Sequence, residues 1–488
     1  MGLLFIEIIL VILVFFFSSG INGNDFWWHV KAGEWIATHG QIPQTDIFSW
    51  IGMEKGISWT AHEWLAEVIF YLIHMFAGEI GIYLLTLIFV GMLSLLMYIK
   101  VKDALVRNYL LAGLFFACYA ITTSIFFYGR PHVFSYFLLF AELHLLYEFY
   151  EKKGSKKIWL IPLIACLWSN LHGGSSSLAY LLCFVFLGIS CLEISWGRVY
   201  ASRLQKKELL TLAMVAVTSL GAILVNPVGW KVLTYPYTSL GDALMMKVIS
   251  EWQAPDAKMI GHVILFFLPI GLMTIGLITE EVKVRMIDIA VMLVFLYLFF
   301  RSSRFIILWD IAAVFYACRY IPECNVKKIS TKYEEWTMRG CLLLLAGLMC
   351  WGGYRIVKTV SEGNIITKVL SEEMVEQVKA SEPQRLFNDY NLGEALIYNE
   401  IEVFFDARAD LFAAEGIFAD GLSLTFLECA TKSDGGVYAD IEGLVDKYQF
   451  DSMLLLKVRP IYAYVMSHPE RYRLLFEDDS CGYFQVLR

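Results

Sequence analysis

The feature that most constrains the fold is a series of long apolar stretches recurring along the 488-residue chain. Many approach the roughly 20 residues that an α-helix needs to cross a bilayer. The sequence is 58% hydrophobic and only 18% charged, whereas a soluble protein carries about a quarter charged residues. We therefore expect a mainly α, polytopic helical membrane protein of about eleven transmembrane helices. The expected spans are 2–19, 80–98, 109–126, 133–150, 158–169, 178–194, 209–225, 262–278, 287–300, 305–320 and 341–357.

Basic residues follow every second expected span. They cluster at 100–107, 152–157, 198–207, 283–285 and 327–339. Positive residues mark the cytoplasmic side, so we expect a cytoplasmic N-terminus and an extracytoplasmic C-terminal part. We interpret 2–19 as an uncleaved span and not a signal peptide, because no basic residues precede it. Nucleic acid is not an expected partner, since the sequence has no basic domain and no strip of basic and aromatic residues.

Two segments are too polar to cross a bilayer. We expect a transmembrane domain of residues 1–358, whose first outer loop is 20–79, and a small extracytoplasmic α/β domain of residues 359–488. In the loop, 62–76 has an apolar helical face and is expected on the membrane surface. In the α/β domain, we predict a helix at 367–380 and strands at 386–389, 402–405, 451–456 and 482–487. Cys429 and Cys481 form a disulfide if this domain faces an oxidising compartment.

The unusual polar and aromatic residues fall on the outer side of this topology. The outer loops carry, in chain order, Asp25, Trp28, His29, His62 and Glu63, then Arg130 and His132, then Asn170 and His172, then Asn226, Glu251 and Trp252, then Arg301 and Arg304. Asp406, Arg408 and Asp410 follow in the C-terminal domain. Each residue alone has a simpler explanation, such as a cap, a turn, a surface ion pair or an interfacial anchor. Their shared side indicates a functional site, because polar groups at membrane depth are costly.

This set of side chains suits one kind of chemistry. Arginine matches the geometry of phosphate, and a phosphate at this depth belongs to a lipid. A carboxylate acts as a general base toward a hydroxyl, and indole, amide and imidazole groups suit a sugar ring. The pattern therefore predicts transfer of a glycosyl group from a lipid phosphate. The predicted donor-phosphate ligands are Arg130, Arg301 and Arg304, and the predicted substrate contacts are Trp28, His29, His62, His132, Asn170, His172, Asn226, Glu251 and Trp252.

The sequence also resembles a known family. The segments 25–34, 168–174, 226–229, 387–393 and 406–410 are similar to those of bacterial members of the GT-C superfamily. These are membrane glycosyltransferases that use polyprenyl-phosphate-linked sugars. The resemblance implies that Asp25 is catalytic. We take Glu63 as a second candidate for the base and expect the acceptor to be an extracytoplasmic glycan, lipid or protein. The sequence lacks the Asp-Glu pair of protein mannosyltransferases and the Trp-Trp-Asp run of oligosaccharyltransferases, so it implies neither activity.

Three questions stay open at this level. The resemblance implies no cofactor, although Asp25, His29, His62 and Glu63 are able to supply metal ligands. A transporter or flippase of lipid-linked sugars is a second interpretation, and it predicts charges at mid-bilayer. Glu142 and His144, within 133–150, are the exceptions to spans that are otherwise nearly free of charge in their middles. A non-catalytic scaffold is a third interpretation, and it leaves the one-sided polar set unexplained.

Overall fold

The computed structural model describes residues 26–108, 129–239, 242–256, 283–320, 369–428 and 438–487, with isolated positions between 271 and 358. The chain divides into two compact units. The first, here the helical unit, comprises Met1–Gly20, Ile80–Pro236 and Ile249–Lys358. The second, here the α/β unit, comprises Ile21–Glu79, Tyr237–Val248 and Thr359–Arg488. The first outer loop thus belongs to the α/β unit, whereas the sequence analysis placed it in the transmembrane domain.

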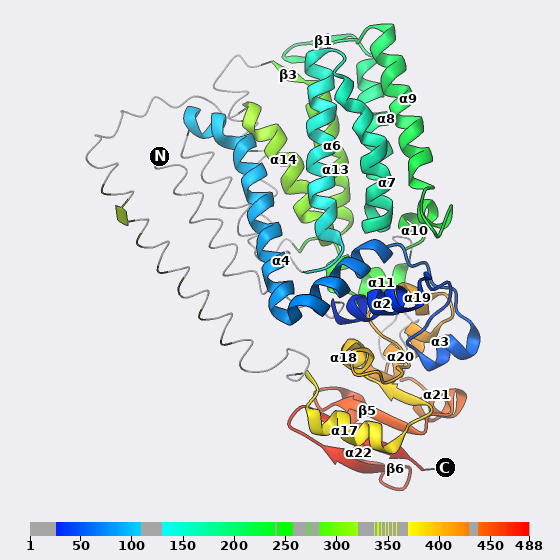
Figure 1. Cartoon of the computed structure of the whole chain (residues 1–488). Coiled ribbons are helices and arrows are strands. Elements are labelled where there is room, and N and C mark those ends of the chain that lie inside the picture. Colours follow the sequence, from blue (N-terminus) through cyan, green and yellow to red (C-terminus); the bar gives the residue numbers. More distant parts are fainter. Residues whose placement is uncertain are drawn as a thin grey trace. The chain divides into compact units, whose positions relative to one another are not determined.

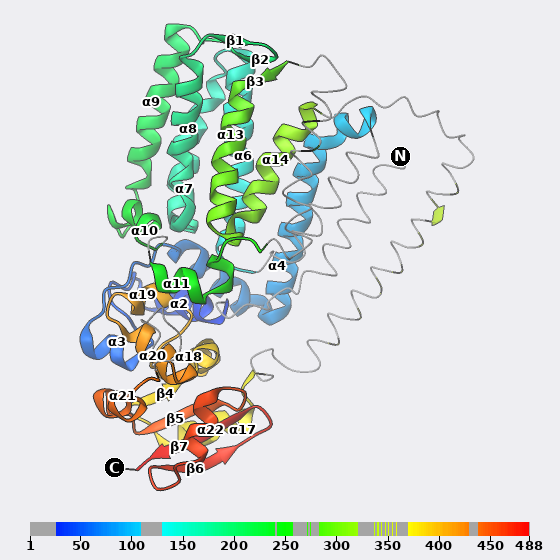
Figure 2. The ribbon, with the colours of Figure 1, turned by 180° about the vertical axis from the view of Figure 1, so that it is seen from behind.

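The helical unit is a bundle whose members coincide with expected spans (Figures 1 and 2). Its long helices are the later part of α4 (Trp64–Arg107), then α6 (His132–Lys152), α7 (Ile161–Leu171), α8 (Leu178–Ser190), α9 (Lys206–Ile223), α13 (Met286–Arg301) and α14 (Ile306–Tyr320). Short elements connect them: η1 (Lys156–Leu160), η2 (Gly173–Ser175), α10 (Lys231–Ser239), η3 (Ser250–Trp252) and η4 (Ser303–Phe305). Large side chains fill its core, among them Trp168, Phe186 and Trp309. The expected spans 2–19 and 109–126 lie outside the described residues, as do most positions of 262–278 and 341–357.

Helix α4 combines two segments that the sequence analysis treated separately. Its backbone leaves the helical conformation at Gly78, where φ is 58° and ψ is −154°. A positive φ of this kind is readily adopted by glycine. Among the described residues, three helical segments are long and apolar enough to cross a membrane: Trp64–Ile82, Leu84–Ala104 and Gly173–Ser190. The chain is therefore an integral membrane protein by these criteria, and the count of eleven spans stays a prediction.

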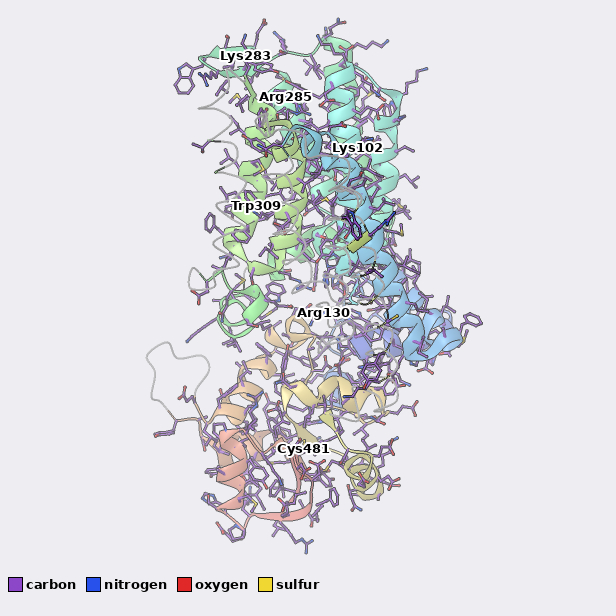
Figure 3. The ribbon with its side chains drawn as sticks, turned by 90° about the vertical axis from the view of Figure 1, so that its left-hand side faces the viewer. Lys102, Arg130, Lys283, Arg285, Trp309 and Cys481 are labelled. Carbon is purple, nitrogen blue, oxygen red and sulfur yellow. The ribbon has the colours of Figure 1, made fainter. Side chains whose placement is uncertain are left out.

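Basic side chains lie toward both ends of the helical unit. Figure 3 shows Lys102, Lys283 and Arg285 toward one end and Arg130 toward the other. At the first end, β1 (Ile194–Trp196), β2 (Val199–Ala201) and β3 (Val284–Arg285) form a small sheet in that order. Arg285 is buried there and binds Asp288 through two hydrogen bonds of 2.9 and 2.7 Å. The sequence pattern predicts that this end is the cytoplasmic side.

The α/β unit is built around a four-stranded sheet of order β4-β5-β7-β6. Its strands are β4 (Leu386–Asn388), β5 (Ser452–Leu456), β6 (Tyr472–Glu477) and β7 (Cys481–Val486). Strand β4 pairs with β5 in parallel, and the other two pairings are antiparallel. The helices of this unit are α2 (Phe26–His39), α3 (Trp50–Lys55), the start of α4, α11 (Ala243–Val248), α17 (Glu372–Ser381), α18 (Gly393–Tyr398), α19 (Ala409–Ala413), α20 (Ile417–Phe426), α21 (Ile441–Tyr448) and α22 (Pro460–Met466), with the short turn η5 (Tyr390–Leu392). Cys481 is a buried free thiol, and Cys429 lies outside the described residues.

The first outer loop is part of this unit's core. The indole Nε1 of Trp50 donates to the carbonyl of Leu386 on β4 at 3.0 Å. The backbone of Val403 pairs with the loop, since its N–H donates to Phe48 and its carbonyl accepts from Trp50. The predicted strand at 402–405 is therefore wrong: only Val403 forms a bridge, to Ser49. Its consecutive apolar residues, Val403, Phe404 and Phe405, are all buried and do not extend the sheet.

Candidate functional site

In the helical unit, a partly buried ion pair joins two of the predicted site residues. Arg130 lies just before α6, and its Nη1 is 3.0 and 3.2 Å from the two carboxylate oxygens of Glu251. Burial opposes the charge on Glu251, but Arg130, Arg304 and His132 outweigh it and hold the pKa of Glu251 at about 2. The carboxylate is thus ionised at neutral pH. Its contribution to stability is present above its ordinary pKa of 4.5 and is lost as the pH falls toward 2.

The turn between α13 and α14 holds the segment that carries Glu251. The hydroxyls of Ser302 and Ser303 both donate to the carbonyl of Glu251, at 2.8 and 3.0 Å. The guanidinium of Arg304 lies over the ring of Trp252, 5.3 Å from its centroid. The two serines were not among the predicted residues, because a hydroxyl that binds backbone leaves no distinctive sequence pattern. They fix the position of both Glu251 and Arg304.

A second group of polar side chains orients His172. Its Nδ1 is 2.6 Å from the hydroxyl of Ser135 and 2.9 Å from that of Ser175. The indole of Trp168 donates to the same two hydroxyls at 2.8 and 3.1 Å. The ring of His172 lies 6.4 Å from that of His132. The structure therefore brings together six predicted residues of the helical unit: Arg130, His132, His172, Glu251, Trp252 and Arg304.

Three other predicted residues of this unit have a different setting. Asn170 donates to the carbonyls of Cys166 and Val225 at 2.7 and 2.8 Å, and Asn226 donates to that of Ser169. These bonds join the end of α7 to the end of α9, which favours a structural role for both amides over substrate contact. Arg301 is exposed at the last turn of α13. Its participation in a phosphate site stays a prediction.

In the α/β unit, a glycine lets two helices come unusually close. A Cβ on Gly33 of α2 would lie 2.0 Å from the carbonyl oxygen of Glu67 on α4 and 2.9 Å from Cβ of Tyr71. No other residue fits there without moving backbone. His29 precedes Gly33 by one helical turn, so the close approach brings the imidazole to the polar face of α4.

We expect Gly33→Ala to destabilise the α/β unit by about 1–3 kcal/mol, because the helices must move apart. The matched control is Gly188→Ala in α8, where a Cβ meets nothing within 4 Å. That change removes backbone freedom from the unfolded chain and is expected to be neutral or stabilising by up to about 1 kcal/mol. Thermal unfolding followed by tryptophan fluorescence measures both. Shifts of the same sign and size contradict the packing argument.

His29 lies between two carboxylates of α4 and the turn before it. Its Nδ1 is 3.3 Å from Oε1 of Glu67, and its Nε2 is 3.7 Å from Oε2 of Glu63. His62 approaches the other oxygen of Glu63 at 3.7 Å. The ring of Trp28 stacks beside that of His29, with centroids 3.6 Å apart. Four predicted residues thus converge, and Glu67 joins them; its place one helical turn after Glu63 was the available sequence signal.

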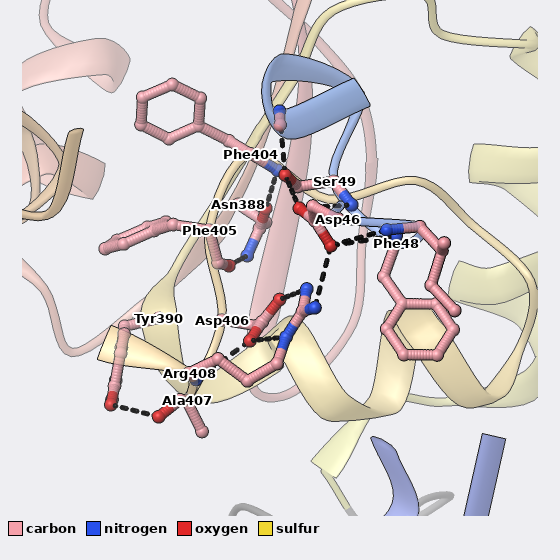
Figure 4. A network of polar contacts seen from close by, with 12 residues as sticks. Asp46, Phe48, Ser49, Asn388, Tyr390, Phe404, Phe405, Asp406, Ala407 and Arg408 are labelled. Carbon is pink, nitrogen blue, oxygen red and sulfur yellow. Dashed lines mark hydrogen bonds and ion pairs between the residues drawn. The ribbon is translucent and has the colours of Figure 1, made fainter. Parts of the chain in front are cut away.

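A buried arginine connects the first loop to the C-terminal residues of this unit (Figure 4). Arg408 binds Asp406 through Nε and Nη2, at 2.9 and 2.6 Å, and binds Asp46 through Nη1 at 2.7 Å. All three side chains are at most 2% exposed. Burial opposes the charge on Arg408, but the two carboxylates raise its pKa above the ordinary value.

Aromatic rings complete the surroundings of Arg408. Its guanidinium lies 4.8 Å from the ring of Trp59, 5.1 Å from that of Phe48 and 5.9 Å from that of Trp28. Trp28 also stacks on His29, so the arginine and the His29 cluster belong to one continuous network. The simpler explanation of 406–410 as a surface ion pair does not hold for Asp406 and Arg408, because both are buried. Asp46 was missed, since nothing near it in the sequence points to a partner 362 positions away.

Asp25, the predicted catalytic residue, lies outside the described residues. The predicted residues that the structure does describe form two groups, one in each unit. Their convergence in one cavity stays a prediction.

Comparisons with known proteins complete the description. No family model matches the chain, and no curated protein matches it. Among solved structures, the chain is similar to the apo crystal structure of an oligosaccharyltransferase from Archaeoglobus fulgidus. The TM-score is 0.49 at 11% sequence identity, and the match covers 93% of this chain and 69% of that one.

Proposed function

We propose that this chain transfers a glycosyl group from a polyprenyl-phosphate-linked sugar to an extracytoplasmic acceptor. The observation that carries the proposal is the group formed by Arg130, Arg304 and His132 around Glu251 in the helical unit. It combines a planar arginine fork, a second guanidinium and an imidazole, all suited to a phosphate. Arg130 lies toward the end of the unit away from Lys102, Lys283 and Arg285, which supports an extracytoplasmic position (Figure 3).

In this proposal the donor phosphate binds Arg304 and His132 and competes with Glu251 for Arg130. Asp25 accepts the proton of an acceptor hydroxyl. The acceptor oxygen forms a bond to the anomeric carbon as the bond from that carbon to the phosphate oxygen breaks. The electron pair of the broken bond stays on the lipid phosphate, whose charge the two arginines stabilise. Glu63 is the second candidate for the base.

We expect Arg304→Ala to weaken binding of a polyprenyl monophosphate by at least about 10-fold, because a charge-assisted contact contributes roughly 1.5–3 kcal/mol. The control is Arg319→Ala in the last turn of α14, whereas Arg304 lies just before that helix begins. This variant should keep its affinity for the polyprenyl monophosphate within about 2-fold of the unmodified chain. The purified chain in lipid nanodiscs is titrated with the polyprenyl monophosphate, and with the matching polyprenol to report the apolar contribution. Unchanged affinity in both Arg304→Ala and Arg130→Ala excludes a phosphate at this group.

A second candidate function is movement of a lipid-linked sugar between leaflets. The observation that favours it is Glu142 in α6, a fully buried carboxylate whose two oxygens have no hydrogen-bond partner among the described residues. Charged residues at membrane depth mark the pathways of transporters. Reconstituted vesicles separate the two functions. A flippase moves the donor across the bilayer without forming product, whereas the proposed transferase consumes donor only when acceptor is present.

A further inference from the structure

We propose that His29, Glu63 and Glu67 bind a divalent transition-metal ion that links α2 to α4 in the first outer loop. The proposal does not depend on the function proposed above, and it replaces the sequence-based expectation that the chain has no metal. It rests on three observations: the geometry of the ligand atoms, an unsatisfied carboxylate oxygen, and an excess of buried negative charge.

The geometry suits a single ion. One ligand atom from each of the three residues lies within 4.8 Å of the other two. Ligand atoms around a transition metal at roughly 2.0–2.2 Å are themselves about 3–4 Å apart, so a small inward movement of the side chains completes the site. The three residues are buried, with His29 3% exposed and the Glu67 side chain 1% exposed. Gly33 and the close approach of the two helices keep this geometry in place.

The carboxylate of Glu67 is only partly satisfied. Its Oε1 lies against His29, but its Oε2 is buried and has no hydrogen-bond partner among the residues that the structure describes. A buried carboxylate oxygen without a partner is costly, and such oxygens usually bind a donor, a water or an ion. In the proposed site, this oxygen is a ligand of the metal ion.

The surrounding charge favours a cation. Among the residues that the structure describes, the buried network contains the carboxylates of Asp46, Glu63, Glu67 and Asp406 but one arginine, Arg408. That arginine is already bound to Asp46 and Asp406. Glu63 lies against the imidazoles of His29 and His62, and Glu67 lies against that of His29. Two carboxylates that share a buried site repel each other when both are ionised, and a divalent ion between them removes that repulsion.

His62 is positioned to act as a further ligand. Its Nδ1 is 2.9 Å from the carbonyl oxygen of Thr60, and because a carbonyl only accepts, Nδ1 carries the proton. Its Nε2 faces Glu63 at 3.7 Å. A histidine that donates one ring N–H to a backbone carbonyl is the usual arrangement of a metal ligand. Imidazoles combined with carboxylates suit Zn²⁺ or Mn²⁺, whereas Ca²⁺ and Mg²⁺ prefer oxygen ligands alone.

The test measures metal on the full chain in detergent. After chelator treatment and gel filtration, the protein is loaded with Zn²⁺ or Mn²⁺ alone, and bound metal is counted by mass spectrometry. We expect about one tightly bound ion per chain and a higher melting temperature with metal. Glu67→Gln should weaken binding at least about 10-fold. Glu54→Gln removes an exposed carboxylate of the same loop, which pairs with Arg385. This variant should leave metal binding unchanged.

A second measurement needs no variant that is at risk of misfolding. Pulsed electron paramagnetic resonance of Mn²⁺ on the unmodified chain should show coupling to an imidazole nitrogen. The competing arrangement is a metal-free triad in which a doubly protonated His29 bridges the two carboxylates. Absence of stoichiometric metal, absence of nitrogen coupling, or equal affinity in Glu67→Gln and the unmodified chain each overturns the proposal in favour of that triad.

Discussion

Replacing Arg408 with methionine is expected to lower the free energy of unfolding of the α/β unit by about 3–5 kcal/mol. Methionine fills much of the same space among Trp59, Phe48 and Trp28 but removes the only guanidinium that Asp46 and Asp406 share. Two carboxylates then stay buried without a cation, and their desolvation is no longer compensated. Chemical denaturation of the detergent-solubilised chain, followed by tryptophan fluorescence, measures the change.

The matched control is Arg471→Met, which makes the same change at an accessible ion pair. Arg471 binds Glu442 at 3.1 Å, where the carboxylate side chain is 41% exposed. Such a pair contributes about 0–1 kcal/mol, so this variant should unfold almost as the unmodified chain does. If Arg408→Met is no more destabilised than Arg471→Met, the buried triad does not hold the first loop to the C-terminal residues.

Changing Asp25 to asparagine is expected to reduce the rate of glycosyl transfer by about 10²–10⁴-fold, the usual contribution of a general base. Asparagine keeps the size of the side chain but accepts no proton at neutral pH. Donor affinity should change little, because the proposed phosphate ligands are Arg130 and Arg304. The measurement is single-turnover transfer from a polyprenyl-phosphate sugar, with donor binding determined in parallel.

Two other carboxylates of the loop serve as comparisons for Asp25. Glu34→Gln alters an exposed side chain of α2 that pairs with Lys31, and it should keep full activity. Glu63→Gln tests whether Glu63, the second candidate, is the base. Because Glu63 lies beside His29, we expect this variant to be less stable as well. Transfer by Asp25→Asn at more than a third of the normal rate, with intact donor binding, removes Asp25 from the catalytic role.

Periodicity and hydropathy predicted the parts of the fold that depend on local sequence. Helices α6, α7, α8, α9, α13 and α14 occur where apolar stretches indicated them, and β4, β5 and β7 occur within a residue or two of the expected strands. Strand β6 was not predicted, because Tyr472–Glu477 is mostly exposed or half-buried along its length and lacks the alternation of a half-buried strand. An element was therefore predicted when a short window of sequence carried its hydropathy pattern, and missed when it did not.

Contacts between residues far apart in the sequence were predicted only in part. Outer-loop position predicted that Arg130, His132, Glu251 and Arg304 lie together, and the structure joins them. It did not predict Asp46, whose role depends on Arg408 far along the chain, nor Ser302 and Ser303, whose hydroxyls bind a backbone carbonyl. It also assigned Asn170 and Asn226 to substrate, which stays a prediction; in the structure both amides donate to backbone carbonyls.

The contact between Trp50 and Leu386 has a consequence for biosynthesis. These residues are 336 positions apart in the chain. At typical translation rates of roughly 5–20 residues per second, the loop leaves the ribosome on the order of half a minute before its partner strand is made. During that interval the loop presents apolar surface, including the side chains of Trp50 and Ile51, which are buried only in the finished protein. The nascent loop is therefore a natural substrate for chaperones at the membrane, and the C-terminal residues produced alone lack part of their own core.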